Sequence, residues 1–252
     1  MAETVATPEI MNNHPKAIII LMRHEESTAN ANRRYIQGFN PTVPLSDKGE
    51  ERARTSAGPG LANFLAASKV EIVAAYTSKA DRAKNSARIV LTAAGVSVPV
   101  TVDERLDEQG RGDKAIGGVE GMERATVETA AYKARQELEG WNFLPGVDDQ
   151  PGVRESGAET PREAAARWHS WRDDVTILIE SGGLPTTIDP DSTPAIFVNA
   201  HNLTTSFALG DERGMTVSEG EALYKVDNGE AFILGWDGQT WNLEGQLYRP
   251  SA

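Results

Sequence analysis

Short apolar runs alternate along this chain with longer segments whose apolar positions have the period of a helix. Ala17–Met22 is rich in β-branched residues and follows Pro15, which predicts a strand buried on both faces. Glu71–Thr77, Val98–Val102 and Ala195–Val198 are further predicted strands. This alternation indicates an α/β protein, in which helices connect the strands of a largely parallel sheet.

Two helices are predicted between the early strands. The first spans about Asp47–Ala67, with an interruption expected at residues 58–60, where the sequence reads Gly-Pro-Gly. The second spans about Lys79–Ala94, and Ser78 and Asp81 resemble the two ends of a capping box at its start.

The C-terminal half predicts one long helix and a group of strands. Thr160-Pro161-Arg162-Glu163 combines an N-cap residue, a proline at the first helical position and a box partner, so it predicts a helix start. Trp168, Trp171 and Val175 then recur on one face up to about Glu180. Residues 223–248 predict two or three strands, with Asp237-Gly238 as a hairpin turn.

These elements predict a single domain over residues 1–252. Its expected fold is a three-layer α/β/α arrangement, with a mostly parallel central sheet flanked by helices on both faces. Residues 109–160 are the least regular part, with one predicted helix around Ala125–Leu138, and are expected to form a lid or specificity insertion. Trp141 and Phe143 in this part are expected either to cover the site or to form a satellite hydrophobic cluster.

The composition narrows the classes of partner and chemistry. The net charge of −12 argues against nucleic acid and anionic membranes, which select basic surfaces. No cysteine is present, which excludes disulfides and thiolate catalysis. No apolar stretch approaches the roughly 18 residues of a membrane span, and residues 1–15 do not resemble a secretory signal, so a cytoplasmic location is expected. The oligomeric state stays open, with a dimer among the options.

Residues whose side chains can bind ions or take part in reactions follow three of the predicted strands. Arg23-His24 follows the first, Ser78 and Arg82 follow the second, and His201 comes just after 195–198. Because the carboxyl ends of parallel strands meet at one edge of a sheet, these side chains are expected in one crevice. An arginine grips an oxyanion with a rigid fork of donors, and an imidazole can attack or move protons.

The sequence around these residues resembles the histidine phosphatase superfamily, which contains cofactor-dependent phosphoglycerate mutases and many phosphomonoesterases. The family's Arg-His-Gly-Glu-Ser/Thr opening corresponds here to Arg23-His24-Glu25-Glu26-Ser27, followed by a matching Asn30. The other matching segments come in the family's order: Gln37-Gly38, Pro44-Leu45-Ser46 with Gly49, Ser78…Arg82-Ala83…Ser86-Ala87, Leu106-Asp107-Glu108, Gly157-Ala158-Glu159-Thr160…Arg167 and Val198-Asn199-Ala200-His201.

The resemblance implies a metal-independent phosphomonoesterase that acts on a small phosphorylated metabolite without a cofactor. In that scheme His24 attacks phosphorus and forms a phosphohistidine, and Glu108 protonates the leaving group and then activates water. The phosphate oxygens would be bound by four side chains: Arg23, Asn30, Arg82 and His201.

Two positions depart from the family pattern, since Glu25 and Asn202 stand where the family has glycine. A carboxylate about 6 Å from phosphate would cost about 3 kcal/mol at an effective dielectric constant near 20. Glu25 is therefore expected to turn outward or to pair with a basic residue, and a further hypothesis is that it meets a cationic group on the substrate. Both positions are candidates for substrate specificity.

Several alternatives stay open at this point. A phosphomutase is one, although Gly110-Arg111-Gly112 stands where the mutases have a tyrosine-glycine segment. A metallohydrolase with His24, His201 and Glu108 as ligands is disfavoured by the two arginines, and no metal is expected. A non-catalytic phospholigand-binding protein is the third. Acidic residues crowd the loop around Glu108, so a solvated acidic run competes with a catalytic role for that residue.

Overall fold

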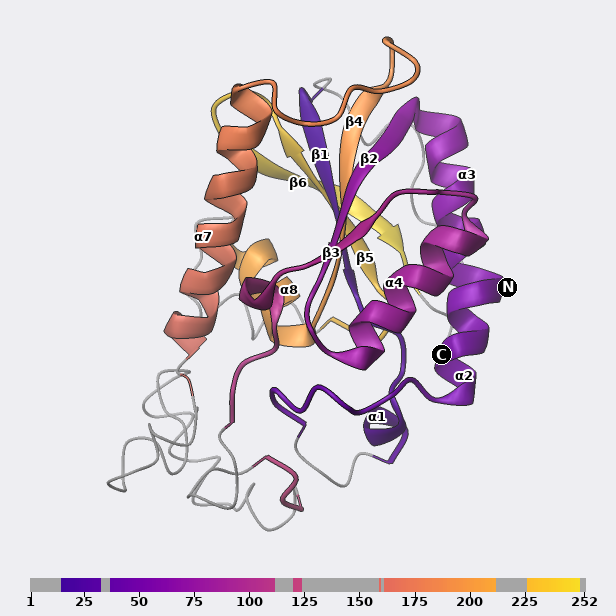
Figure 1. Ribbon diagram of the computed structural model, residues 1–252, viewed down its shortest axis with the longest axis vertical. Helices are drawn as coiled ribbons and strands as arrows, with labels where there is room; N and C mark the ends of the chain where they lie inside the picture. The colour runs from indigo at the N-terminus through magenta and orange to yellow at the C-terminus, as the bar shows by residue number, and fades with distance from the viewer. Residues whose placement is uncertain are drawn as a thin grey trace.

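The six strands of one sheet form the centre of the protein, seen in a computed structural model (Figure 1). The model describes residues 15–32, 37–111, 120–123, 159, 161–211 and 226–249. The strands are β1 Ala17–Arg23, β2 Val70–Thr77, β3 Val100–Val102, β4 Thr193–Ala200, β5 Ala231–Trp236 and β6 Trp241–Tyr248. Each of the predicted strands is present.

The order of the strands across the sheet is β3-β2-β4-β1-β5-β6. The pairs β1–β4, β2–β4 and β2–β3 are parallel, and the pairs β1–β5 and β5–β6 are antiparallel. The predicted mostly parallel sheet is therefore confirmed, with an antiparallel extension built by the C-terminal hairpin. In the turn of that hairpin the carboxylate of Asp237 accepts hydrogen bonds from the amides of Gln239 and Thr240, and Gly238 has φ +105°.

Helices lie on both faces of the sheet. They are α1 Thr28–Asn32, α2 Asp47–Arg52, α3 Gly58–Ser68, α4 Asp81–Ala93, α7 Pro161–Glu180 and α8 Asn202–Asp211, with a π-helical turn at Ala53–Ala57 and a 3-10 turn at Glu104–Leu106. Figure 1 shows α2, α3 and α4 on one side of the sheet and α7 on the other. None of the helices in the described ranges is long and apolar enough to cross a membrane.

The central strand β1 explains why an unbroken apolar run is needed here. Ile18 and Ile20 belong to the core between the sheet and α3 and α4, whereas Ile19 and Leu21 belong to the core that contains Trp168 and other residues of α7 and α8. Because successive side chains of a strand point to opposite faces, both faces of β1 are buried.

Two local predictions are wrong. The helix over 47–67 does not break at its Gly-Pro-Gly. The chain instead makes a π turn at Ala53–Ala57, where the amide of Gly58 donates to the carbonyl of Ala53, and Pro59 lies in the first turn of α3. Proline lacks an amide hydrogen, so the first turn of a helix accommodates it without losing a bond.

The capping box at the start of α4 is also absent. The N-cap is Ala80, which has no side-chain capping bond, and the hydroxyl of Ser78 instead bonds the amide of Ala80 and a histidine described below. The long helix ends at Glu180 as predicted, while Thr160 lies outside the described residues. The single-domain assignment stays a prediction, as do the insertion at 109–160, its helix around 125–138, and Trp141 and Phe143, because most of that segment lies outside the described residues.

Candidate active site

The carboxyl ends of β1, β2 and β4 bring the predicted residues together. Arg23 ends β1 and His24 follows it, Ser78 follows β2, Arg82 lies in the first turn of α4, and His201 follows β4. His24, Arg82 and His201 are at most 3% exposed. A polar cluster therefore lies at the edge of the sheet where open α/β folds bind ligands.

His24 is held in one tautomer. Its Nδ1 lies 2.7 Å from the carbonyl oxygen of Glu25, which only accepts, so Nδ1 carries the proton. Its Nε2 accepts from the Nε of Arg82 at 3.3 Å. Burial and the charges of Arg82 and Arg23 lower the pKa of His24 well below its usual range. At neutral pH the ring is therefore neutral, with a lone pair on Nε2.

His201 has the opposite arrangement. Its Nδ1 accepts from Nη2 of Arg82 at 3.4 Å, so Nε2 carries the proton and donates to the hydroxyl of Ser78 at 2.7 Å. Burial lowers the pKa of His201 well below its usual range, and the charge of Arg82 adds to the effect. The two histidine rings meet edge to face, with centroids 5.1 Å apart and an interplanar angle of 70°.

Arg82 is fixed by a loop that wraps around its guanidinium group. The carbonyls of Asn40 and Gly38 accept from Nη1 and Nη2 at 2.7 and 3.1 Å. The carboxylate of Glu120 accepts from the amide of Phe39 at 2.7 Å and so supports the same loop. Gly38 has φ +50°, a left-handed conformation that glycine adopts without strain. Backbone carbonyls thus orient Arg82 between the two histidines.

Only some of the N–H donors of Arg23 have a hydrogen-bond partner within the described ranges. Nη1 donates to the carbonyl of Val226, while Nε is buried and has no hydrogen-bond partner in the described part of the chain. Burial lowers the pKa of Arg23, and the charge of Glu108 acts in the opposite direction. A buried guanidinium donor without a partner is costly, and an oxyanion at this position would satisfy it.

Glu108 lies near both arginines, since its charge raises the pKa of Arg82 as well as that of Arg23. Its neighbours do not form one solvated acidic run. Asp107 is only 4% exposed and pairs with Lys79 at 3.1 Å, whereas the side chain of Glu104 is 77% exposed. Asp113, also in this run, lies outside the described residues.

Arg167 organises the loop that carries Glu108. Its Nη1 donates to the carbonyls of Arg105 and Asp107 at 3.0 and 3.2 Å, and its Nη2 donates to the carbonyl of Glu108 at 3.3 Å. The carboxylate of Glu159 binds the guanidinium group through both oxygens at 2.8 Å. Glu159 therefore acts on the loop through Arg167, which a helix-start motif in the sequence does not reveal.

Three further predicted positions have different environments. The Oδ1 of Asn30 accepts from the hydroxyl of Ser27 at 2.8 Å, which leaves its Nδ2 as the donor for a ligand. Asn202 opens α8, and its Oδ1 is buried without a hydrogen-bond partner among the described residues. Glu25 is 0% exposed and pairs with Arg52 at 2.6 Å, so the expected pairing with a basic residue is present and the outward turn is not.

Two residues of this region are not found by the sequence reading. Arg52 ends α2, and Asn228 lies between α8 and β5, where Asp227-Asn228-Gly229 is the local signal of a turn. Nothing in the spacing of these residues indicates a link to His24, because helix α2 and the segment before β5 are far apart along the chain. In the described ranges, no group of three or more His, Asp or Glu side chains has the geometry of a metal site.

The chain is similar to known proteins over most of its length. Residues 19–246 match the family model of the histidine phosphatase superfamily, branch 1. A 2,3-bisphosphoglycerate-dependent phosphoglycerate mutase of Gloeobacter violaceus is 31% identical over 153 residues, which cover 60% of this chain and 59% of the relative. The chain thus matches about three fifths of the length of that relative.

Solved structures share the fold at lower identity. A mycobacterial glucosyl-3-phosphoglycerate phosphatase superposes with a TM-score of 0.67 and 20% identity, covering 92% of this chain and 99% of that one. A phosphoglycerate mutase from Bacillus anthracis gives 0.68 and 19%, covering 91% and 92%. With the family model matching most of the sequence, the chain belongs to branch 1 of the histidine phosphatase superfamily.

Proposed function

We propose that this protein is a metal-independent phosphomonoesterase that acts on a small phosphorylated metabolite through a phosphohistidine. One observation carries the proposal: His24 is neutral, its Nδ1–H is held by a carbonyl, and its Nε2 lone pair faces a buried guanidinium group. A nucleophilic imidazole needs this protonation state, and a phosphate dianion needs such charges beside it.

The first step is attack of Nε2 on phosphorus, which breaks the bond to the leaving oxygen. The unpartnered Nε of Arg23 and the guanidinium group of Arg82 bind the non-bridging oxygens. A bound dianion offsets the two arginine charges, which raises the pKa of His201. Its Nδ1 can then take a proton and donate to the same oxygens, where negative charge is stabilised in the transition state.

Glu108 is the proposed proton donor to the leaving oxygen and the base for the attacking water. Glu108 interacts electrostatically with both arginines, and Arg167 holds its loop by a hydrogen bond to its carbonyl. General acid–base catalysis of this kind contributes about 10²–10⁴-fold to the rate. Hydrolysis of the phosphohistidine then returns His24 and releases inorganic phosphate.

A panel of phosphomonoesters tests the proposal. Wild type, with chelator present, is expected to release phosphate from at least one class of compound, and His24→Ala is expected to release none. Acid-labile, base-stable label from a ³²P-substrate should appear on wild type only. Turnover that survives in His24→Ala, or that needs a metal ion, would contradict the proposal.

A phosphomutase is the second candidate, because the curated relative from Gloeobacter violaceus is a phosphoglycerate mutase. The two activities differ in the acceptor of the phosphoryl group, which is water in one case and a second hydroxyl in the other. Monophosphoglycerate offered with 2,3-bisphosphoglycerate separates them. Interconversion of the isomers without phosphate release identifies a mutase, and phosphate release without interconversion identifies the phosphatase.

A further inference from the structure

A buried carboxylate directly follows the proposed nucleophile. Glu25 is 0% exposed, its Oε2 accepts from Nη2 of Arg52 at 2.6 Å, and its Oε1 is buried without a hydrogen-bond partner among the described residues. Removing a carboxylate from water costs several kcal/mol unless other interactions offset it. A carboxylate kept beside an anion-binding cluster therefore needs an explanation.

The pair formed by Glu25 and Arg52 is connected to the backbone of His24. The same Nη2 of Arg52 donates to the carbonyl of Asn228 at 2.6 Å. The side-chain amide of Asn228 donates to the carbonyl of His24 at 3.1 Å and to Oδ1 of Asn30 at 3.0 Å. Hydrogen bonds to the backbone and to the side chain of Asn228 thus connect the carboxylate to the peptide group of His24.

The backbone of residue 25 is fixed from the other side as well. Its carbonyl accepts from Nδ1 of His24 at 2.7 Å, and its amide donates to the hydroxyl of Ser86 at 3.2 Å. The direction of that carbonyl decides both the tautomer of His24 and the direction of its Nε2. That carbonyl belongs to the peptide between Glu25 and Glu26, and the peptide between His24 and Glu25 sets its direction, so a small rotation at either peptide would move the nucleophilic nitrogen.

The loop before β5 is shaped to fit the carboxylate. Gly229 has φ +85°, and a Cβ atom at this position would lie 2.3 Å from Oε1 of Glu25. The amide of Gly229 bonds the carbonyls of Arg23 and His24, each at 3.2 Å. Glycine is the residue that allows this conformation and this close approach.

We propose that Glu25, acting through Arg52 and Asn228, is a positioning residue that holds the peptide after His24 so that Nε2 points at phosphorus. The inference rests on the proposed function of His24 as nucleophile. It replaces the hypothesis that Glu25 meets a cationic substrate group, because the side chain is fully buried and its Oε2 is bound to Arg52.

Steady-state kinetics give the first test. Glu25→Ala removes the acceptor for Arg52, and a misplaced nucleophile is expected to lower kcat by about 10- to 100-fold with KM nearly unchanged. Glu25→Gln keeps an oxygen that accepts from Arg52 but lacks the charge, so it is expected to recover only part of the loss and to match the kcat of wild type with protonated Glu25. The matched control is Glu51→Ala on α2, whose exposed pair with Arg54 at 3.3 Å should not affect kcat.

The pH profile gives a second readout. Burial raises the pKa of Glu25 from 4.5 to about 7, and the charge and hydrogen bond of Arg52 oppose the rise. Burial and the charge of Glu25 raise the pKa of the Tyr248 phenol, so this group is a further titratable neighbour of the carboxylate, with Arg52 and Glu26. Protonation of Glu25 weakens its bond to Arg52, so wild type is expected to lose kcat as the pH falls through about 7. Glu25→Gln should lack this limb.

A third readout does not need turnover. ¹⁵N-edited NMR of His24 is expected to show a proton on Nδ1 in wild type, and a mixture of tautomers in Glu25→Ala but not in Glu51→Ala. A kcat and a His24 signal that are unchanged in a folded Glu25→Ala would overturn the positioning role. Wild type without any phosphoryl transfer, but with this NMR difference, would overturn the proposed function and leave the positioning role in place.

Discussion

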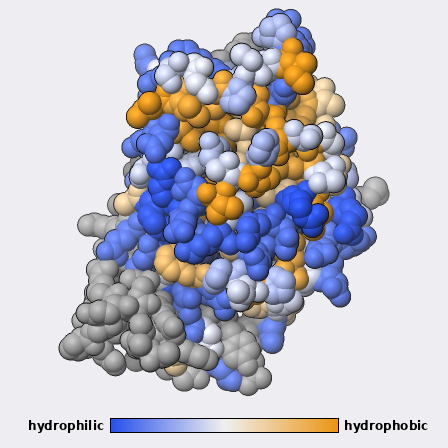
Figure 2. Space-filling view, in the orientation of Figure 1, coloured by the Kyte–Doolittle hydropathy of each residue, from blue (hydrophilic) through white to orange (hydrophobic). Residues whose placement is uncertain are grey.

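The two edges of the central sheet differ in how far their side chains are buried. At the carboxyl edge of β1, β2 and β4, charged and polar side chains are buried and held by backbone groups, as for Arg82 and His201. At the amino edge, the loop between α7 and β4 is exposed, and Ile188 at its tip is 93% exposed. Figure 2 shows hydrophobic surface in the upper part of this view, where the amino edge lies.

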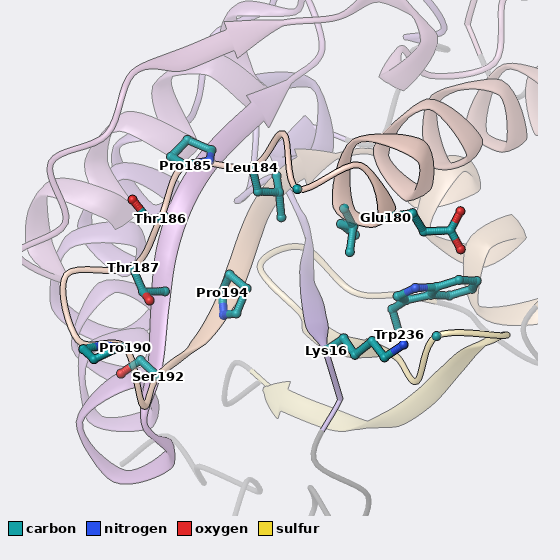
Figure 3. Close-up of a pocket in the computed structure, with 13 residues that line it drawn as sticks. Lys16, Glu180, Leu184, Pro185, Thr186, Thr187, Pro190, Ser192, Pro194 and Trp236 are labelled. Atoms are coloured by element: carbon teal, nitrogen blue, oxygen red, sulfur yellow. The ribbon is translucent and has the colours of Figure 1, made fainter.

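The amino edge has its own pocket, of about 620 Å³ (Figure 3). Lys16, Glu180, Leu184, Pro194 and Trp236 are among the side chains that line it, between the end of α7 and the starts of β1 and β4. These groups include a single ammonium and a single carboxylate group, without a histidine or an arginine.

The difference indicates what the proposed phosphoryl-transfer site requires from a fold. Burying cations and imidazoles is costly, and hydrogen-bond partners must offset their loss of hydration. The loops that follow three parallel strands meet at the carboxyl edge. At the amino edge, the loop between α7 and β4 is held by the carboxylate of Glu71, which accepts from the amide of Ile188 at 2.8 Å. Three predictions test this contrast, from the largest effect to the smallest.

Arg82→Lys should have the largest effect. Lysine cannot reach Asn40, Gly38 and both histidines at once, so its ammonium group is not held in the position of the guanidinium group. The loss of two charge-assisted bonds to phosphate, of about 1.5–3 kcal/mol each, is expected to lower kcat/KM by about 10²–10⁴-fold. Arg88→Lys, at an exposed position of the same helix, is the control. Activity within about threefold of wild type in Arg82→Lys would refute the role given to its fork of donors.

Trp236→Ala at the amino edge should lower the stability of the protein without lowering kcat/KM. Its side chain is 7% exposed and packs on Trp241 with ring centroids 5.6 Å apart, so truncation is expected to lower the free energy of unfolding by about 3–5 kcal/mol. At a temperature where the variant is folded, kcat/KM should equal that of wild type. Urea unfolding and phosphate release measure the two quantities, with exposed Gln239→Ala as control.

A stability difference of this size with a parallel loss of kcat/KM would show that the two edges are energetically coupled. That outcome would contradict the separation of stability and chemistry between them.

Acid should destabilise the carboxyl edge. The pKa of His201 lies well below its usual 6.5, so the unfolded chain takes up a proton as the pH falls below that value while the folded protein does not. Stability is therefore present above pH 6.5 and is lost on acidification. His201→Asn should reduce the slope of unfolding free energy against pH by about 1.4 kcal/mol per unit between about pH 5 and 6. Equal slopes would refute the buried neutral histidine.

Much of the carboxyl edge is predictable from the sequence. The unbroken apolar run of β1 predicts a strand with both faces covered, and polar residues just beyond three such strands predict one cluster. Arg23, His24, Arg82 and His201 meet for this reason. Strand direction, which is a backbone property, is enough to bring them to one edge.

Local patterns fail where a distant group competes for a side chain. Ser78 resembles a helix cap in the sequence, but its hydroxyl accepts from His201, a residue on another strand connection. Gly58-Pro59 resembles a break, but packing of α3 on the core keeps the helix continuous through a π turn. Propensity is a weak prior, and tertiary contacts override it.

The sequence by itself determined the order of strands and helices along the chain, the edge at which the polar residues gather and the residues that meet there, because these follow from burial periodicity and strand direction. Only the tertiary structure decided the tautomers of His24 and His201, the carbonyls that fix Arg82, and the pairing of Glu25 with Arg52. Those features depend on hydrogen bonds between segments far apart along the chain, whose geometry no local pattern encodes.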